Sequence, residues 1–227
     1  MNIVSSIALL GAGCLLLSGL LEAKPRTCRI VYPERPRGAP KVAWLFDGEH
    51  SRSISLPDKT LSPVMPLPEG ELVLVMTPEE VGAPEALPPQ APRLRIPGEV
   101  ADFYILITPD PGNPVLPVRM DLVDSQEGGL KPGQTLWFNR TQHQIVAKLG
   151  DTALVVKSQA RAISTKPAAE SGYYTAEFQY RVNGEGPLVR ITEQSWWHDA
   201  GSRHLGFIVS AGGRLPKIFF YRDFRSP

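Results

Sequence analysis

The chain has 227 residues, with 24 Lys or Arg against 23 Asp or Glu, so its net charge is +1. No basic stripe with interleaved aromatics is present, which argues against a nucleic-acid partner. The 23 prolines are about twice the usual share of roughly 5%. Because proline lacks a backbone donor and breaks helix interiors, long helices have little room to form. We therefore predict an all-β protein.

The N-terminus is typical of an export signal. Residues 3–21 are nearly all apolar or small, and the run stops at Glu22-Ala23-Lys24-Pro25. A segment of this length with small residues near its end predicts a signal peptide over residues 1–23 and a periplasmic or cell-surface location. Two alternatives stay open. About 18–20 apolar residues can also remain as a membrane anchor, and Cys14 follows small residues as a lipidated cysteine does.

Cysteine use limits the chemistry of the exported chain. Once the signal is removed, Cys28 is the only cysteine, which excludes an intrachain disulfide. A zinc cage built from several thiolates is excluded for the same reason. Cys28 lies on the first predicted strand, where we expect a small buried hydrophobe.

The first part of the chain reads as short strands separated by prolines and turns. Asp47-Gly48 is a hairpin signal, and the proline-rich stretch 77–92 is predicted to be irregular. The strands are expected at residues 26–32, 41–46, 52–56, 64–67, 71–76, 93–96, 102–108 and 117–123.

The second part repeats this scheme after a polar, glycine-bearing stretch at 125–132. We place a domain boundary there, giving domains at 24–126 and 127–227. A boundary at 77–92 is less suitable, because it leaves too few residues before it for an independent core. The strands are expected at residues 134–139, 144–149, 152–156, 161–164, 173–182, 188–192 with 195–197, 204–210 and 217–224.

The two parts resemble each other. The strand carrying Trp44 and Phe46 matches the strand carrying Trp137 and Phe138 at an offset of 93 residues. Residues 116–121 match residues 215–220 at an offset of 99. A period near 100 residues is typical of immunoglobulin-like sandwiches, so we predict two of them in tandem.

Sequence motifs give little support for catalysis. The chain has no G-x-S-x-G, H-E-x-x-H, G-x-G-x-x-G or P-loop motif. A three-residue spacing on a strand points Ser195 and His198 to opposite faces. His198 and His204 flank a short hairpin beside Asp199, and two histidines with a carboxylate can hold a divalent ion. Because no third ligand converges on this pair, we predict that the chain binds no metal. Because the catalytic motifs are missing, we predict no cofactor and no catalytic residues.

Adjacent aromatic residues are the best indication of a binding surface. Neighbours on a strand point to opposite faces, so each pair should place one ring in the core and one outside. If the outer rings share a sheet, they form a platform for sugar rings or for an apolar partner surface. The candidate binding residues are Tyr173, Tyr174, Trp196 and Trp197. The run Phe219-Phe220-Tyr221 has the same pattern.

Residues 132–143, PGQTLWFNRTQH, resemble the strand before the first histidine ligand of cupredoxins, with His143 in a comparable place. The copper site of that family also needs a cysteine and a second histidine near the C-terminus. No cysteine follows Cys28, so the resemblance implies strand geometry alone. Within this segment, Asn139-Arg140-Thr141 spells a glycosylation sequon, which we interpret as coincidence.

The whole layout resembles uncharacterised exported bacterial proteins built from two β-sandwich modules. The shared features are the signal, the W-F-N-x-T strand with its following Leu-Gly turn, and the late aromatic strands. The resemblance carries no activity with it, so we predict a non-enzymatic binding or interaction module whose partner is a protein or glycan of the cell envelope. The alternatives are a carbohydrate-binding module that uses exposed aromatics and a divalent-metal-binding cupredoxin-like domain.

Overall fold

The computed structural model describes residues 25–125, 129–182, 185–210 and 215–224. The expected signal peptide, residues 1–23, lies outside these ranges, and so does the expected boundary at 126–127. The described chain is all-β, as predicted, and contains no α-helix; a 3-10 turn, η1 (Pro84–Ala86), lies in the proline-rich stretch. No helix among the described residues is long and apolar enough to cross a bilayer.

The first eight strands form two sheets of four. Sheet I has the order β3 (Ser51–Ser55), β2 (Val42–Phe46), β5 (Leu72–Thr77), β6 (Arg93–Ile96). Sheet II has the order β4 (Met65–Pro66), β1 (Thr27–Val31), β7 (Asp102–Pro109), β8 (Val118–Asp124). All neighbours are antiparallel except β1 and β7, which are parallel. The expected Asp47-Gly48 turn joins β2 to β3.

The last eight strands repeat this arrangement. Sheet III has the order β12 (Arg161–Ser164), β9 (Thr135–Asn139), β15 (Arg203–Val209), β16 (Lys217–Asp223). Sheet IV has the order β11 (Thr152–Val156), β10 (Gln144–Leu149), β13 (Gly172–Arg181), β14 (Val189–His198). The only parallel pair among the described strands of these two sheets is β9 with β15, the counterpart of β1 with β7.

The strand order corrects one detail of the internal repeat. Strands β1 to β8 correspond in order to β9 to β16, so the match between β8 and β16 at an offset of 99 is confirmed. The match between the two tryptophan strands is wrong. Trp44 lies on β2 of sheet I, whereas Trp137 lies on β9, the counterpart of β1. The two strands are alike because both contribute aromatics to packed sheets, and composition alone does not distinguish their places.

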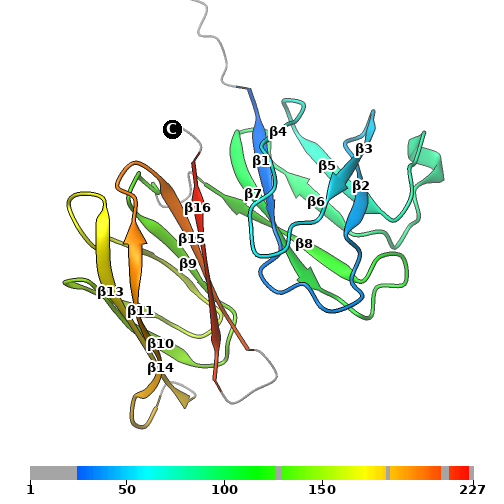
Figure 1. The fold of residues 1–227 in the computed structure, drawn as a ribbon. Coiled ribbons are helices and arrows are strands. Elements are labelled where there is room, and N and C mark those ends of the chain that lie inside the picture. Colours follow the sequence, from blue (N-terminus) through cyan, green and yellow to red (C-terminus); the bar gives the residue numbers. More distant parts are fainter. Residues whose placement is uncertain (1–24, 126–128, 183–184, 211–214, 225–227) are drawn as a thin grey trace, which may run out of the picture.

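The four sheets stack as layers in the order I, II, III, IV, with the second half on the left and the first half on the right of Figure 1. One hydrophobic core lies between sheets I and II and contains Cys28, buried as predicted. A second core lies between sheets III and IV. A third lies between the halves, where sheet II packs against sheet III through residues including Tyr104, Leu106, Phe138 and Phe207.

This stacking explains the long apolar strands of the sequence. Strand β7 begins DFYILI, and all six of these residues are buried. A strand that is buried on just one of its faces has alternating apolar and polar residues. A strand that is covered on both faces is apolar throughout. Sheet II is covered by sheet I on one face and by sheet III on the other, so β7 has no solvent-facing side chains along this run.

Candidate functional site

The four aromatic residues predicted to bind lie side by side on neighbouring strands of sheet IV. In the antiparallel register of β13 and β14, Tyr173 is opposite Trp197, and Tyr174 is opposite Trp196. Tyr173 is 75% exposed and Trp197 is 43% exposed, whereas Tyr174 is buried and Trp196 is half-buried. The expected division into one inner and one outer pair is therefore present, and a binding role for these residues stays a prediction.

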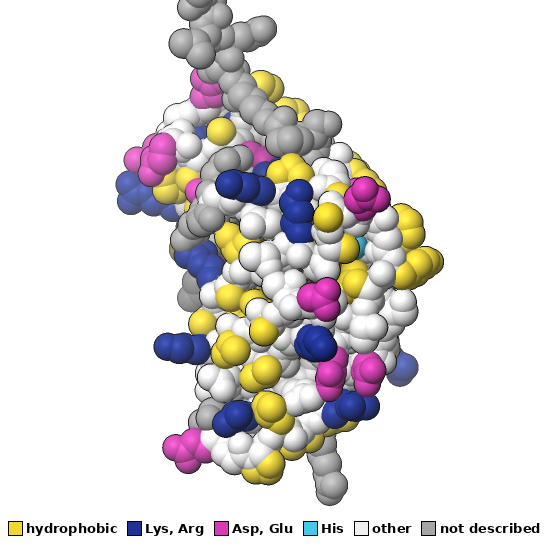
Figure 2. Space-filling view, turned by 90° about the vertical axis from the view of Figure 1, so that its left-hand side faces the viewer, with side chains coloured by type: hydrophobic (Ala, Val, Ile, Leu, Met, Phe, Trp, Pro, Cys, Tyr) yellow, Lys and Arg dark blue, Asp and Glu magenta, His cyan; other side chains and the backbone are white. Residues whose placement is uncertain are grey.

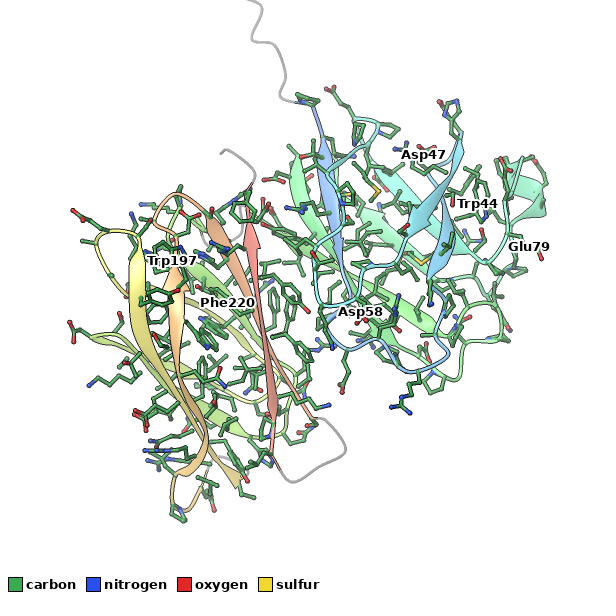
Figure 3. All side chains as sticks on the ribbon, viewed as in Figure 1. Trp44, Asp47, Asp58, Glu79, Trp197 and Phe220 are labelled. Carbon is green, nitrogen blue, oxygen red and sulfur yellow. The ribbon has the colours of Figure 1, made fainter. Side chains whose placement is uncertain are left out.

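The inner pair belongs to the core of the second half. The ring of Trp196 lies 5.1 Å from that of Phe220 and 5.4 Å from that of Phe178, measured between centroids. Phe220 extends from β16 into the space between sheets III and IV (Figure 3). Burial raises the pKa of the Tyr174 hydroxyl well above its usual range. Both side chains therefore pack in the core of the second half, Tyr174 fully and Trp196 in part.

The outer pair is an exposed aromatic corner. The ring centroids of Tyr173 and Trp197 are 5.1 Å apart, and the ring planes meet at 78°. This edge-to-face arrangement is favoured by the ring quadrupoles. Because the ring planes are nearly perpendicular, the two rings do not form the single flat platform that we predicted for outer rings on one sheet.

The same outer face of sheet IV contains a shallow hollow of about 230 Å³. Its rim combines the charged side chains Lys148 and Glu177 with the apolar Val146 and Ala153. Glu177 lies four residues from Tyr173 along β13, which is about 13 Å for an extended strand. In Figure 2, which shows this side of the molecule, apolar side chains lie among single charges of both signs. The outer face of sheet IV thus combines exposed aromatics, a hollow and mixed charge.

The third aromatic run is packed on both sides. Phe220 faces the core of the second half, whereas Phe219 and Tyr221 belong to the core between the halves. The expected outer face of β16 is therefore covered by sheet II. The stacking of the two halves leaves this run no ring on a free sheet face.

The histidine hairpin brings its two imidazoles together, as its spacing suggested. His198 and His204 are buried, with ring centroids 5.9 Å apart, and His204 stacks on Phe220 at 5.0 Å. Burial lowers the pKa of both imidazoles, that of His204 to about 4. Asp199 instead accepts hydrogen bonds from the Gly201 amide (3.0 Å) and the Ser202 hydroxyl (2.8 Å).

No cluster of three metal-ligating side chains occurs among the residues that the structure describes. Within the described ranges, the two histidines are thus not joined by the third ligand that a divalent ion would need. Neutral imidazoles packed on aromatic rings contribute to the core of the second half.

The sequon at Asn139 is inaccessible in the folded chain. Asn139 is fully buried, and its side-chain nitrogen donates to the carbonyls of His143, Val156 and Lys157 at 2.7–3.1 Å. Its side-chain oxygen accepts from the amide and hydroxyl of Thr141. A glycan would replace one of the two hydrogens of this nitrogen and has no room beside the three carbonyls, so the asparagine serves to fix the loop after β9.

A buried ionic network joins the two halves, and sequence reasoning missed it. Asp223 of β16 is fully buried, accepts from the Arg29 guanidinium at 2.8 Å and also accepts from the hydroxyl of Tyr104. Arg203 of β15 donates to Asp102 of β7 at 2.7 Å. Each ion pair links sheet II to sheet III. Burying charges is costly unless they are paired, so the network ties the halves to one relative position.

Two sequence signals were available for this network. Asp102 opens the most apolar strand of the first half, and Asp223 closes the aromatic run of β16. A carboxylate at the end of an apolar strand is ordinarily solvated at a turn. Only the stacking of sheets II and III shows that these two are enclosed.

No known protein family matches the sequence, and no curated protein is significantly similar to it.

Proposed function

We propose that the chain is an exported, non-enzymatic binding protein of the cell envelope, built from two tandem immunoglobulin-like sandwiches at residues 24–126 and 127–227. Its contact surface is the outer face of sheet IV, and its partner is another protein. The observation that carries the proposal is the exposed pair of Tyr173 and Trp197 on neighbouring strands. Large aromatics are enriched at the energetically important positions of protein interfaces.

The internal repeat supports this choice of face. On the outer face of sheet I, the exposed cross-strand pair of the corresponding strands β5 and β6 is Val73 and Arg95. The aromatics of that face, Trp44 and Phe46, lie on β2 and are half-buried and buried. The two halves share their strand order, so the backbone requires no aromatic at these places. The exposed rings on sheet IV therefore mark a surface whose role goes beyond holding the fold.

A protein partner fits this face better than a glycan. A sugar ring stacks on a flat aromatic surface, and the 78° angle between the rings of Tyr173 and Trp197 leaves only one ring available at a time. The charged rim of the hollow, with Lys148 and Glu177, instead suits the polar edge of a protein interface.

The test is recovery of a partner from cell-envelope extract on immobilised protein. The purified chain should retain one specific protein, and both Trp197→Ala and Tyr173→Ala should lose it. Val73→Ala alters the corresponding face of the first half and should bind as the unchanged protein does. Recovery of the bait alone, or equal capture by all variants, would overturn the proposal.

The glycan alternative makes a different prediction. An exposed tryptophan that stacks on a sugar changes its fluorescence on binding. Titration with a panel of polysaccharides should leave the emission unchanged if the partner is a protein. Quenching that disappears in Trp197→Ala would favour a carbohydrate-binding module instead.

A further inference from the structure

The last strand of sheet IV has a free edge. Strand β14 pairs with β13 on one side, and no other described strand pairs with it on the other. Within the described ranges, no backbone hydrogen bond from a turn or loop reaches β14 either. In such a strand, every second residue points its N–H and C=O groups away from the sheet. The edge of β14 therefore presents a row of backbone donors and acceptors to which another strand can pair.

Strand β14 lacks most of the features that protect an edge. It has 10 residues, whereas the other strands that end a sheet in the described chain have 2 to 7. Its sequence, VRITEQSWWH, contains no proline or glycine. The register with β13 shifts once, between Phe178 and Gln179, and is regular from Thr192 to His198. This regular stretch is about 23 Å long.

The interior of the second half is open to solvent along the same edge. Gln194 and Thr192 lie opposite the fully buried Ala176 and Phe178, so their side chains face inward. Gln194 is nevertheless exposed, and Thr192 is half-buried. The indole nitrogen of Trp196 donates to the side-chain oxygen of Gln194 at 3.2 Å in an exposed hydrogen bond. Water therefore reaches the space between sheets III and IV past β14.

Apolar side chains line this opening. On β16, which ends sheet III, the core-facing Ile218 and Phe220 are only half-buried. On β14, Ile191 and Trp196 are half-buried too, and the rings of Trp196 and Phe220 lie 5.1 Å apart. These four side chains form an apolar strip beside the free edge of β14.

The first half closes the corresponding edge. Strands β6 and β8, the counterparts of β14 and β16, pack against each other, whereas β14 and β16 make no comparable contact. The core-facing Leu94 and Ile96 of β6 are buried, and so are Val118 and Met120 of β8. This strand order can therefore seal its own edge. In the second half, uncovered apolar surface and a free strand edge occur at the same place.

We propose that the edge of β14 accepts an extended segment of a protein partner as an additional strand of sheet IV. Main-chain hydrogen bonds to β14 give affinity, as in other cases of strand addition. The segment has apolar side chains at alternate positions, because alternate residues of a strand share one face and would cover the apolar strip. This inference rests on the proposed function for the class of partner. Its site is separate, since Tyr173 lies on β13, behind the edge strand.

A second copy of the chain fits the edge less well. Two β14 strands could pair with each other in antiparallel fashion, and each would then bring its inward-facing side chains to the strip of the other. Over the regular stretch these are Thr192, Gln194, Trp196 and His198. Most of them are polar, whereas the strip that they would cover is apolar. A strand with apolar residues at every second position is the better complement.

The test uses a fluorescently labelled peptide that alternates valine and threonine over nine positions, with a lysine at each end for solubility. Its binding to the purified chain is followed by fluorescence anisotropy. A peptide of the same composition, with its valines grouped in one block, should bind at least tenfold more weakly. Two N-methylated forms, one at all valine amides and one at all threonine amides, identify the bonds. Only one of these two sets faces β14, so one form should lose binding at least tenfold and the other should keep it.

Three variants of the chain locate the site. Gln194→Lys places an inward-pointing charge on the edge and should weaken binding at least tenfold. Val155→Lys is the matched control on β11, at the other end of sheet IV, where Val155 is 53% exposed; it should bind as the unchanged chain does. Tyr173→Ala removes a ring of the aromatic corner and should also leave the peptide affinity unchanged. Thermal unfolding establishes that each variant is folded.

The outcomes separate this site from the outer face of sheet IV. Absence of peptide binding, equal effects of the two N-methylated forms, or equal binding by Gln194→Lys would overturn the edge site. Sedimentation of the chain alone should show a monomer, and a dimer that Gln194→Lys dissociates would show that a second copy occupies the edge and would overturn the proposed occupant. If the peptide binds as expected but no envelope protein depends on Tyr173 and Trp197, the outer face is refuted and the edge site stands.

Discussion

The ionic network between the halves makes a quantitative prediction about Asp223. Its side chain has no exposed surface and receives hydrogen bonds from Arg29 and Tyr104. Asp223→Asn keeps the shape but removes the negative charge, leaving the Arg29 guanidinium with 15% exposure and no buried counter-charge at this position. Breaking a buried pair by removing one partner costs about 3–5 kcal/mol. We expect this loss in the free energy of unfolding.

The assay is urea denaturation followed by fluorescence. The matched control is Glu71→Gln, which breaks an ion pair of 2.6 Å to Arg95 whose side chains are 57% and 73% exposed. Exposed pairs contribute little even when they are short, so this loss should stay below about 1 kcal/mol. Arg29→Met combined with Asp223→Asn should cost less than the two single changes added together, because the partners are coupled. A loss below about 1 kcal/mol for Asp223→Asn would refute the reasoning.

Three further predictions concern the second half. Because burial lowers the pKa of His204 to about 4, below its unfolded value near 6.5, stability should be full above pH 6.5 and fall by up to about 3 kcal/mol as the pH drops toward 4. Denaturation curves across this range should show the decline, and His204→Gln should reduce it. Gly206→Ala would press a Cβ into the Trp137 ring, well inside van der Waals contact, and should cost about 3 kcal/mol by the same assay. Trp196→Ala should also cost about 3 kcal/mol, whereas Trp197→Ala should cost less than about 1 kcal/mol.

Each of these predictions has a contrary outcome. A pH profile of the same steepness in His204→Gln would assign the acid sensitivity to other groups. Gly82→Ala, with open space around the added carbon, should be close to neutral, and a similar loss at both glycines would argue against the close approach of β15 to Trp137. Equal losses at the two tryptophans would contradict their assignment to opposite faces of sheet IV.

Local sequence rules predicted most of the strands, because they depend on neighbours along the chain. Proline spacing excluded long helices, and two-residue alternation placed Tyr173 and Tyr174 on opposite faces of their strand. The same rules left open which tryptophan faces the core. Trp196 faces inward because it is paired with the buried Tyr174. That register depends on a partner strand which the local pattern of β14 does not identify.

Long-range packing was the part that the sequence did not reveal. Two ion pairs join the halves. Arg29 and Asp223 are 194 residues apart along the chain, and Asp102 and Arg203 are 101 residues apart. Asp102, Arg203 and Asp223 look like ordinary strand-end residues in their own segments, and Arg29 looks like a polar residue in the middle of β1. The continuous apolar run of β7 was the available sign of two-sided burial. It indicates a covered strand without showing what covers it.

The most direct test of the proposed binding face is site-specific photo-crosslinking in the cell envelope. A photoreactive amino acid at position 173 lies on the exposed aromatic corner, and one at position 73 lies on the corresponding face of the first half. We predict a discrete crosslinked protein adduct from position 173 that is absent from position 73. The same adduct from both positions, or none from position 173, would contradict the assignment of the outer face of sheet IV as the contact surface.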